Sequence, residues 1–274
     1  MNDNVYLPKL ARIVDIQDEV FGARAIKTFR VEFAEGDGFE HECGQCAMVS
    51  VFGRGEMMIS IASAPAIKDY KQFSIMRVGR VTTAIHGMQV GDTVGVRGPY
   101  GNQFPLHEWK GRDLVFIGGG VGLAPIWPVI QTAVANRADF GKITVFYGAR
   151  SSRDIMYRAE FEELKSSIDV RLSVDTAEAD WQGYTGFVPA NLLEQAPAAD
   201  NAIAVTCGPP IMIKFVIQNL QQLGFADEQI YTTIENKMKC GVGKCGRCNV
   251  GKDYVCVQGP VYSWAQLKTL PQEY

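Results

Sequence analysis

Four cysteines near the C-terminal end of the sequence have a spacing that can hold an iron–sulfur cluster. Their order is C-x4-C-x2-C-x7-C, and the first three match the plant-type [2Fe–2S] pattern, in which one tight loop wraps the cluster. Glycines between them let the backbone fold closely around sulfide and aim N–H groups at it. The predicted cluster ligands are Cys240, Cys245, Cys248 and Cys256.

A zinc site with four cysteine ligands is the alternative for this segment. Zinc sites usually present two C-x2-C pairs, whereas this segment has one such pair and two single cysteines. No histidine lies nearby, which disfavours a Rieske centre. Lys239, Lys244 and Arg247 add positive charge beside the cysteines, and such charge favours an anionic cluster.

A further C-x2-C pair, Cys43 and Cys46, has no second pair left to join. The remaining cysteine, Cys207, falls on a strand of another predicted domain. We therefore interpret Cys43 and Cys46 as unligated thiols.

A glycine-rich turn follows the apolar strand predicted at Asp113–Gly118 and precedes a helix predicted at Ile126–Ala138. Its glycines would let a pyrophosphate approach backbone N–H groups at the helix N-terminus, where the helix dipole favours anions. The turn lacks the G-x-G-x-x-G fingerprint, and a packing turn without ligand is the alternative. The predicted nucleotide-binding residues of this turn are Gly118, Gly119, Gly120, Gly122, Leu123 and Ala124.

A second turn, which begins at Cys207, closes the strand predicted at Ala202–Thr206 and opens the helix predicted at Ile211–Leu223. It therefore falls at the carboxyl edge of the same sheet, where open α/β sheets bind ligands. A buried structural cysteine is the alternative for Cys207.

The order of these patterns predicts a β plus α/β fold with three domains. Residues 1–107 contain short strands between turns, which is typical of a closed antiparallel barrel. Residues 108–225 alternate strands with helices, which indicates a doubly wound parallel sheet. Residues 226–274 are rich in glycine and cysteine and would form a small C-terminal cluster module.

Composition excludes several other functions. The 274 residues are 47% hydrophobic and 21% charged, with a net charge of −3 and no basic stripe. We therefore expect a globular protein that binds no nucleic acid and does not insert directly into a membrane. Seven cysteines in such a chain favour metal or redox chemistry in the reducing cytoplasm over disulfides.

Taken together, these segments resemble the ferredoxin–NADP⁺ reductase superfamily. More narrowly, the chain is similar to iron–sulfur diaphorase subunits, such as the gamma subunit of [NiFe] sulfhydrogenases, the diaphorase subunit of anaerobic sulfite reductase and the electron-transfer subunit of dihydroorotate dehydrogenase B. Beside the glycine turn, the segments that carry the resemblance are 50–56, 59–63, 77–82, Arg97-Gly-Pro-Tyr-Gly-Asn102, Tyr147-Gly-Ala-Arg150, Cys207-Gly-Pro-Pro-Ile-Met212 and 238–248.

The resemblance implies a barrel that binds FAD, a sheet that binds NAD(P)H and a [2Fe–2S] module. It places Cys207, as the catalytic residue, near the contact of nicotinamide and flavin. The superfamily's R-x-Y-S segment corresponds here to residues 57–60, which lack both the arginine and the tyrosine; Arg77 is the expected substitute for neutralising the FAD phosphates. The residues implied to bind FAD are Met58, Ile59, Ser60, Met76, Arg77, Gly79, Val81 and Thr82. Those implied to bind the nicotinamide nucleotide, beside the glycine turn, are Gly148, Arg150, Asp175, Gly208, Pro209 and Met212.

Residues after the strand predicted at Val170–Val174 bear on the choice of nicotinamide nucleotide. The carboxylate of Asp175 could accept hydrogen bonds from a ribose diol and would repel a 2′-phosphate, which favours NADH. Arg150 and Arg153 would favour NADPH.

These features predict an electron-transfer subunit that links NAD(P)H through FAD and a [2Fe–2S] cluster to a partner. The partners would be catalytic and iron–sulfur subunits of a hydrogenase-, sulfite reductase- or heterodisulfide reductase-like complex. A stand-alone NAD(P)H reductase of a soluble acceptor such as ferredoxin is one alternative, and a flavin and iron–sulfur redox sensor is another.

Overall fold

The computed structural model describes residues 4–34 and 38–271, so the outer ends of the predicted domains 1–107 and 226–274 lie outside the described residues. Contacts divide the chain into two compact units. The first joins Met1–Phe104 to Ile234–Val261, and the second joins Pro105–Thr233 to Tyr262–Tyr274. Most of the predicted cluster segment thus belongs to the first unit, and the division into three domains stays a prediction.

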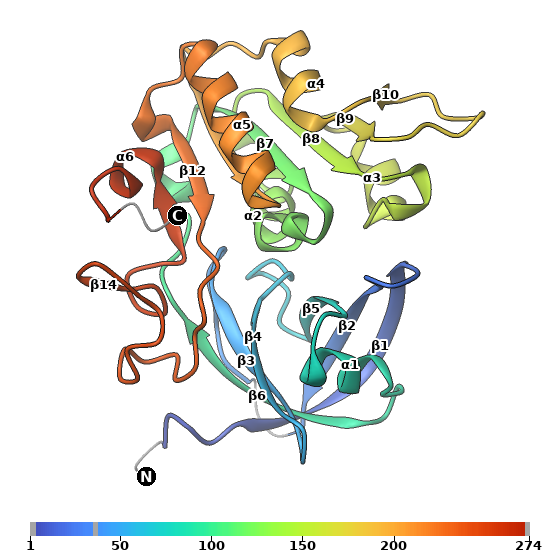
Figure 1. The fold of residues 1–274 in the computed structure, drawn as a ribbon, viewed down its shortest axis with the longest axis vertical. Coiled ribbons are helices and arrows are strands. Elements are labelled where there is room, and N and C mark those ends of the chain that lie inside the picture. Colours follow the sequence, from blue (N-terminus) through green and yellow to red (C-terminus); the bar gives the residue numbers. More distant parts are fainter. Residues whose placement is uncertain (1–3, 35–37, 272–274) are drawn as a thin grey trace. The chain divides into compact units, whose positions relative to one another are not determined.

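The first unit contains a six-stranded antiparallel sheet in the order β4-β3-β6-β1-β2-β5 (Figure 1). Its end strands, β4 and β5, contact each other, which makes the sheet the predicted barrel. The elements are β1 Lys9–Val20, β2 Ile26–Phe33, β3 Cys46–Val51, β4 Gly55–Ser60, β5 Lys71–Met76, β6 Thr93–Tyr100 and the short helix α1 Arg80–His86.

Alternation along the strands builds the core of the barrel. Ala11 and Ile13 of β1, together with Val94 and Val96 of β6, are fully buried. These pairs are two residues apart, as expected for side chains that share one face of a strand. The residues between them point to the opposite face.

The second unit is built on a seven-stranded sheet in the order β10-β9-β8-β7-β11-β12-β15. Its strands are β7 Asp113–Gly119, β8 Ile143–Ala149, β9 Asp169–Val174, β10 Tyr184–Thr185, β11 Ala202–Cys207, β12 Ile230–Thr233 and β15 Val261–Ser263. Its α-helices are α2 Leu123–Ala135, α3 Arg158–Leu164, α4 Val188–Gln195, α5 Pro210–Gln222 and α6 Trp264–Leu267. Short 3₁₀ turns are η1 Leu106–Trp109, η2 Gly120–Gly122, η3 Arg137–Asp139, η4 Ser152–Asp154 and η5 Asp227–Gln229.

The strand order of this sheet confirms the doubly wound prediction. From the central strand β7 the chain moves outward to β8 and β9, and then returns to β11 on the other side of β7. All these pairs are parallel, so the loops that follow β7 and β11 leave the same edge at the point where the order reverses. Ligands of such sheets bind at this switch point.

The helix after the glycine turn begins at Leu123, three residues earlier than predicted. The 3₁₀ turn η2 leads directly into it, so the glycine turn and the helix are continuous. Pro125 falls in the first helical turn, where a backbone N–H has no partner within the helix, and is therefore tolerated.

The segment from Ile234 to Pro260 has little regular structure apart from a small hairpin of β13 Asn249–Val250 and β14 Asp253–Tyr254. Glycine and cysteine in this segment leave few side chains to form a regular core. Within the described residues, no helix combines the length and apolarity that crossing a membrane requires.

A buried histidine of the barrel unit gives its stability a pH dependence. The His41 side chain is only 4% exposed, and its Nε2 donates to the Ser63 carbonyl at 2.9 Å. Its Nδ1 has no hydrogen-bond partner among the described residues. Burial lowers the pKa of His41 from 6.5 to about 4, with Lys71 and Lys68 adding to the effect against the Ser63 hydrogen bond.

Because the folded-state pKa of His41 is depressed, its contribution to stability is complete above pH 6.5 and is lost as the pH falls toward about 4. The loss is at most about 3 kcal/mol. We expect the melting temperature of His41→Gln to fall less than that of the wild type over this pH range. The exposed His107→Gln is the control. Equal pH dependence in wild type and His41→Gln would contradict the assignment.

Candidate functional site

The predicted cluster loop follows a backbone path that requires glycine. Gly241, Gly243 and Gly246 have φ values of +82°, +68° and +69°. These lie in the left-handed region that other residues rarely adopt. The loop therefore turns repeatedly inward between Cys240 and Cys248.

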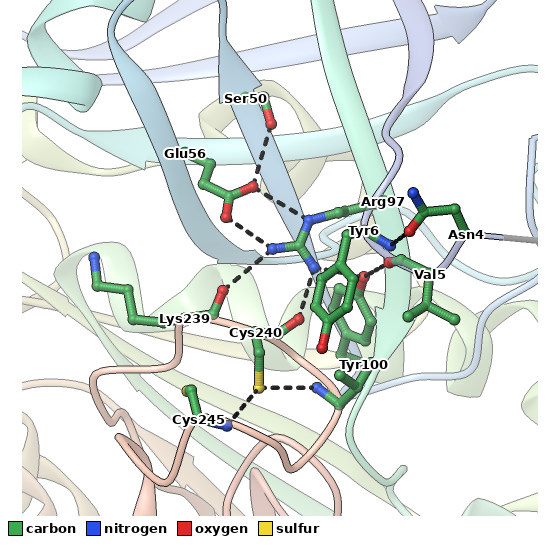
Figure 2. A network of polar contacts seen from close by, with 11 residues as sticks. Asn4, Val5, Tyr6, Ser50, Glu56, Arg97, Tyr100, Lys239, Cys240 and Cys245 are labelled. Carbon is green, nitrogen blue, oxygen red and sulfur yellow. Dashed lines mark hydrogen bonds and ion pairs between the residues drawn. The ribbon is translucent and has the colours of Figure 1, made fainter.

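The inward turns aim backbone N–H groups at cysteine sulfur atoms. Cys240 Sγ accepts from the N–H groups of Val242, Lys244 and Cys245 at 3.5, 3.3 and 3.4 Å. The Gly243 N–H donates to Cys256 Sγ at 3.3 Å. Figure 2 shows the Cys240 sulfur facing the Cys245 N–H group. Donors to sulfur stabilise a thiolate, which is the form that ligates iron.

The thiols of the loop differ in their pKa. Burial raises the pKa of Cys240, but the backbone hydrogen bonds from Val242, Cys245 and Lys244 outweigh burial and lower it to about 6. Burial and the neighbouring Cys248 raise the pKa of Cys256 to about 12, against the hydrogen bond from Gly243. The shifts of Cys240 and Cys256 show that the predicted ligands lie close enough to interact.

The loop fits an iron–sulfur cluster through its sulfur environment. Cys240, Cys248 and Cys256 are buried, whereas Cys245 is exposed. Among residues 4–34 and 38–271, no group of three or more His, Cys, Asp or Glu side chains is arranged to hold a metal ion. The fit therefore rests on the N–H groups that face sulfur and on the pairing of thiols, and the assignment of the four ligands stays a prediction.

The residues predicted to bind FAD gather on neighbouring elements of the barrel unit. Met58, Ile59 and Ser60 are half-buried on β4, which α1 contacts. Met76 ends β5, and Val81 follows Arg80, the first residue of α1. This half-buried and largely apolar strand is suited to the face of a flavin ring.

The predicted phosphate contacts are partly used within the protein. The Thr82 hydroxyl accepts from the N–H groups of Val78 and Gly79 at 3.0 and 2.8 Å, and so caps α1. Arg77 is exposed and its Nη2 donates to the Gly22 carbonyl at 2.9 Å. Arg77 is thus positioned by the barrel, and its contact with a phosphate stays a prediction.

The glycine turn and the turn after Cys207 pack directly against each other in the second unit. A Cβ at Gly122 would lie 2.4 Å from the Gly208 Cα, and a Cβ at Gly119 would lie 2.4 Å from the Met212 Sδ. A Cβ at Gly120 would meet nothing within 4 Å, so that glycine faces open space. The two turns form one surface of backbone, with room for a nucleotide at Gly120.

Cys207 lies at the end of β11, directly beside Gly118 of β7. Its side chain is 3% exposed, and Cys207 Sγ lies 3.1 Å from Thr233 Oγ1. The turn beyond it carries Pro209 into the start of α5. The structure thus brings the predicted catalytic cysteine and the glycine turn to one sheet edge.

The remaining predicted nucleotide contacts follow the next two strands along the same edge. Gly148 lies within β8, and Asp175 follows β9 with its N–H bonded to the Ala149 carbonyl at 3.0 Å. Burial raises the pKa of Asp175, and the charge of Arg150 opposes this rise. Gly148, Arg150 and Asp175 therefore stand together at the carboxyl ends of β8 and β9.

Comparison with known proteins agrees with both halves of this geometry. Residues 116–218 match the oxidoreductase NAD-binding domain family. Residues 235–268 match the iron–sulfur cluster binding domain of dihydroorotate dehydrogenase B. The predicted nicotinamide and iron–sulfur cofactor classes are confirmed by these matches.

Similarity to whole proteins extends over nearly the entire chain. Sulfhydrogenase 1 subunit gamma of Pyrococcus furiosus is 36% identical over 98% of this chain and 95% of its own length. The chain belongs to the family of sulfhydrogenase gamma and dihydroorotate dehydrogenase B electron-transfer subunits. A second member, described as a probable dihydroorotate dehydrogenase B (NAD⁺) electron-transfer subunit of Methanocaldococcus jannaschii, is 32% identical over 95% of this chain and 91% of its own length.

Solved structures show that this electron-transfer subunit family shares a reductase fold. The structure of an NADH-dependent reduced ferredoxin–NADP oxidoreductase superposes with a TM-score of 0.77 at 22% identity, over 95% of this chain and 89% of that one. A ferredoxin–NADP⁺ reductase of Neisseria gonorrhoeae with bound FAD and NADP gives 0.68 at 20% identity, over 81% of this chain and 96% of that one. The predicted fold class is confirmed, and the FAD prediction agrees with it.

Sequence reasoning missed one member of the site. Arg97 of β6 donates from Nη1 to the main-chain carbonyl of Cys240 at 2.7 Å (Figure 2). The sequence contained a signal, because Arg97 opens one of the segments that carry the family resemblance. Its contact with the cluster loop could not be read from that segment alone.

The close packing of the two nucleotide-binding turns gives a direct test. We expect Gly122→Ala to destabilise the protein by about 3 kcal/mol, because the new methyl group would meet backbone that cannot rotate away. It should also raise the KM for NADH, since the two turns would separate. Thermal unfolding and steady-state reduction of a dye measure the two effects.

Gly111→Ala is the matched control in the same unit. Gly111 has a φ of +76° and nothing near its Cβ position, so only backbone strain of about 1 kcal/mol is expected, with KM unchanged. If Gly122→Ala resembled Gly111→Ala in both measurements, the two turns would not form one binding surface.

Proposed function

We propose that this chain is the NAD(P)H-linked electron-transfer subunit of a multi-subunit redox enzyme. In this proposal it passes electrons between a nicotinamide nucleotide, FAD and a [2Fe–2S] cluster. The observation that carries the proposal is the loop whose backbone N–H groups face the sulfur atoms of Cys240 and Cys256. Family membership supplies the rest of the support.

The cofactors divide the chemistry between them. A nicotinamide exchanges two electrons as a hydride, a cluster exchanges one electron at a time, and a flavin handles both. The chain's own residues act by binding and orientation. In the second unit, the backbone of Gly118–Gly122 would hold the pyrophosphate, while Cys207 would lie beside the nicotinamide.

The barrel unit would hold the other two cofactors. The half-buried residues of β4 would line the flavin, with Arg77 near its phosphates. Cys240, Cys245, Cys248 and Cys256 would ligate the cluster, and the N–H groups of the loop would stabilise its anionic charge. Exposure of Cys245 supports a cluster close to the surface of this unit, where a partner subunit could accept electrons.

A partner in a larger complex is supported by the names of the relatives. The sulfhydrogenase gamma and dihydroorotate dehydrogenase B relatives are each named as subunits. We therefore propose that this chain also works with catalytic and iron–sulfur subunits in the cytoplasm.

NADH is the proposed nicotinamide nucleotide. Asp175 stands beside Arg150, whose charge would attract a 2′-phosphate. Arg153, the second arginine nearby, is paired with Glu178, its Nε 2.9 Å from Glu178 Oε1. The charge of Arg153 is thus offset within the protein, which supports a preference set by Asp175.

Removal of one proposed ligand tests the electron path. We expect Cys245→Ala to lose the paramagnetic signal of the reduced cluster and electron delivery to the partner. The rate at which NADH bleaches the flavin should remain that of the wild type, because hydride transfer precedes the cluster. Anaerobic stopped-flow absorbance and electron paramagnetic resonance (EPR) measure these two steps.

Cys43→Ala provides the control, since Cys43 is a buried thiol of the same unit outside the loop. It should keep both the flavin rate and the cluster signal. Partner reduction at the wild-type rate in Cys245→Ala would show that the cluster is structural and that the proposed path is wrong.

Replacement of Asp175 tests nucleotide choice. We expect Asp175→Ser to raise kcat/KM for NADPH relative to NADH by about tenfold, equivalent to about 1.4 kcal/mol, because the repulsion of a 2′-phosphate is removed. Asp180→Ser, on the same connection but beyond Glu178, should leave the ratio unchanged. An unchanged ratio in Asp175→Ser would refute the role given to this carboxylate.

A further inference from the structure

Arg97 is a buried cation at the centre of the barrel unit's polar network. Its side chain is 5% exposed, and β6 presents it toward the cluster loop (Figure 2). A guanidinium has five N–H donors, and Arg97 makes five hydrogen bonds. Its entire donor capacity is therefore committed to fixed partners.

Two of these donors form a fork on one carboxylate. Arg97 Nη2 lies 2.8 Å from Glu56 Oε1, and Arg97 Nε lies 3.2 Å from Glu56 Oε2. Such two-point pairs fix both the distance and the plane of the groups. Glu56 belongs to β4, directly before the residues proposed to line the flavin. The pair thus joins the proposed flavin strand to β6.

Two other donors hold the main chain of the cluster loop. Arg97 Nη1 donates to the Cys240 carbonyl at 2.7 Å, and Arg97 Nη2 donates to the Lys239 carbonyl at 3.2 Å. Cys240 is the proposed ligand whose sulfur receives three N–H groups. The cation therefore fixes the backbone from which this ligand projects.

Aromatic rings enclose the guanidinium and the loop. The Tyr6 and Tyr100 ring centroids lie 5.9 and 5.5 Å from the Arg97 Cζ atom. Arg97 Nη1 also donates to the Tyr100 hydroxyl at 2.9 Å. A Cβ at Gly241 would lie 2.8 Å from the Tyr100 ring, so ring and loop are in direct contact. This packing keeps water from the network, where charge interactions are strong.

We propose that Arg97 is a positioning residue that orients Cys240 and raises the reduction potential of the cluster, while Glu56 opposes the charge effect. The inference rests on the proposed function, because it requires a cluster on Cys240. It adds that one buried ion pair couples the proposed flavin strand to a cluster ligand.

Charge gives the two partners opposite effects. Reduction adds one electron to the cluster, so a nearby cation favours the reduced form and a nearby carboxylate disfavours it. Loss of the Arg97 charge would leave the Glu56 carboxylate without its partner beside the loop. Loss of the Glu56 charge would leave the cation of Arg97 without compensation.

The test measures the reduction potential of the cluster in the full chain by redox titration followed by EPR. We expect a more negative potential in Arg97→Gln and a more positive one in Glu56→Gln. Arg97→Lys keeps the charge but loses the fork, so it should keep a potential near that of the wild type while its EPR line shape changes. NADH should reduce the flavin at the wild-type rate in all three variants.

Arg30→Gln is the matched control. Arg30 lies on the same barrel, pairs with Asp15 at 3.5 Å and sits 5.1 Å from the Tyr70 ring centroid. It has the same kind of surroundings as Arg97 but no bond to the cluster loop, so the potential should not shift. Glu40→Gln, from the exposed ion pair with Lys68, is the corresponding control for Glu56→Gln.

The outcomes separate the inference from the proposed function. A wild-type chain that assembles no cluster would overturn both. A wild-type chain with a cluster whose potential and line shape are the same in Glu56→Gln and Arg97→Lys would overturn the inference alone. These two variants decide the matter even if Arg97→Gln fails to fold, because each retains most of the network.

Discussion

Backbone N–H groups that face sulfur are the constraint on which the iron–sulfur segment depends. A buried thiolate is costly unless donors surround it. Here three N–H groups converge on Cys240 Sγ, which they can do only because Gly241 and Gly243 turn the chain through the left-handed region. The mix of glycine and cysteine is therefore one device, in which glycine supplies the turns and cysteine the sulfur. The surrounding barrel then holds the loop by its carbonyl groups through Arg97.

The parallel sheet of the second unit obeys a separate constraint. Reversal of strand order at β7 and β11 forces two loops to the same edge, and their glycines let the loops touch. A nucleotide can then meet backbone from both loops, with Cys207 between them. Two-electron chemistry needs such a rigid surface for a planar ring. One-electron chemistry needs only a held cluster, which explains why so short a segment suffices for it.

Sequence predicted the parts of the site whose geometry is local. The cysteine spacing and the strand–glycine turn–helix order are read within a few residues, so the cluster loop, the nucleotide turns and the fold class were accessible. The Arg97 network was not, since Glu56 lies 41 residues from Arg97 and Cys240 lies 143 residues from it. Only the register of β4, β3 and β6 brings them together. The capping of α1 by the Thr82 hydroxyl was missed for a similar reason, because a hydroxyl's partner depends on the local turn.

The central claim is that the loop holds a redox cluster that electrons from a nicotinamide can reach within this chain. Anaerobic titration of the purified chain with NADH, followed by EPR together with iron, sulfide and zinc analysis, tests it most directly. We predict bleaching of bound flavin, a single paramagnetic cluster for each flavin, and iron with sulfide in place of zinc. A chain that contains zinc, or one that bleaches its flavin while no cluster signal develops even with a stronger reductant, would contradict this claim.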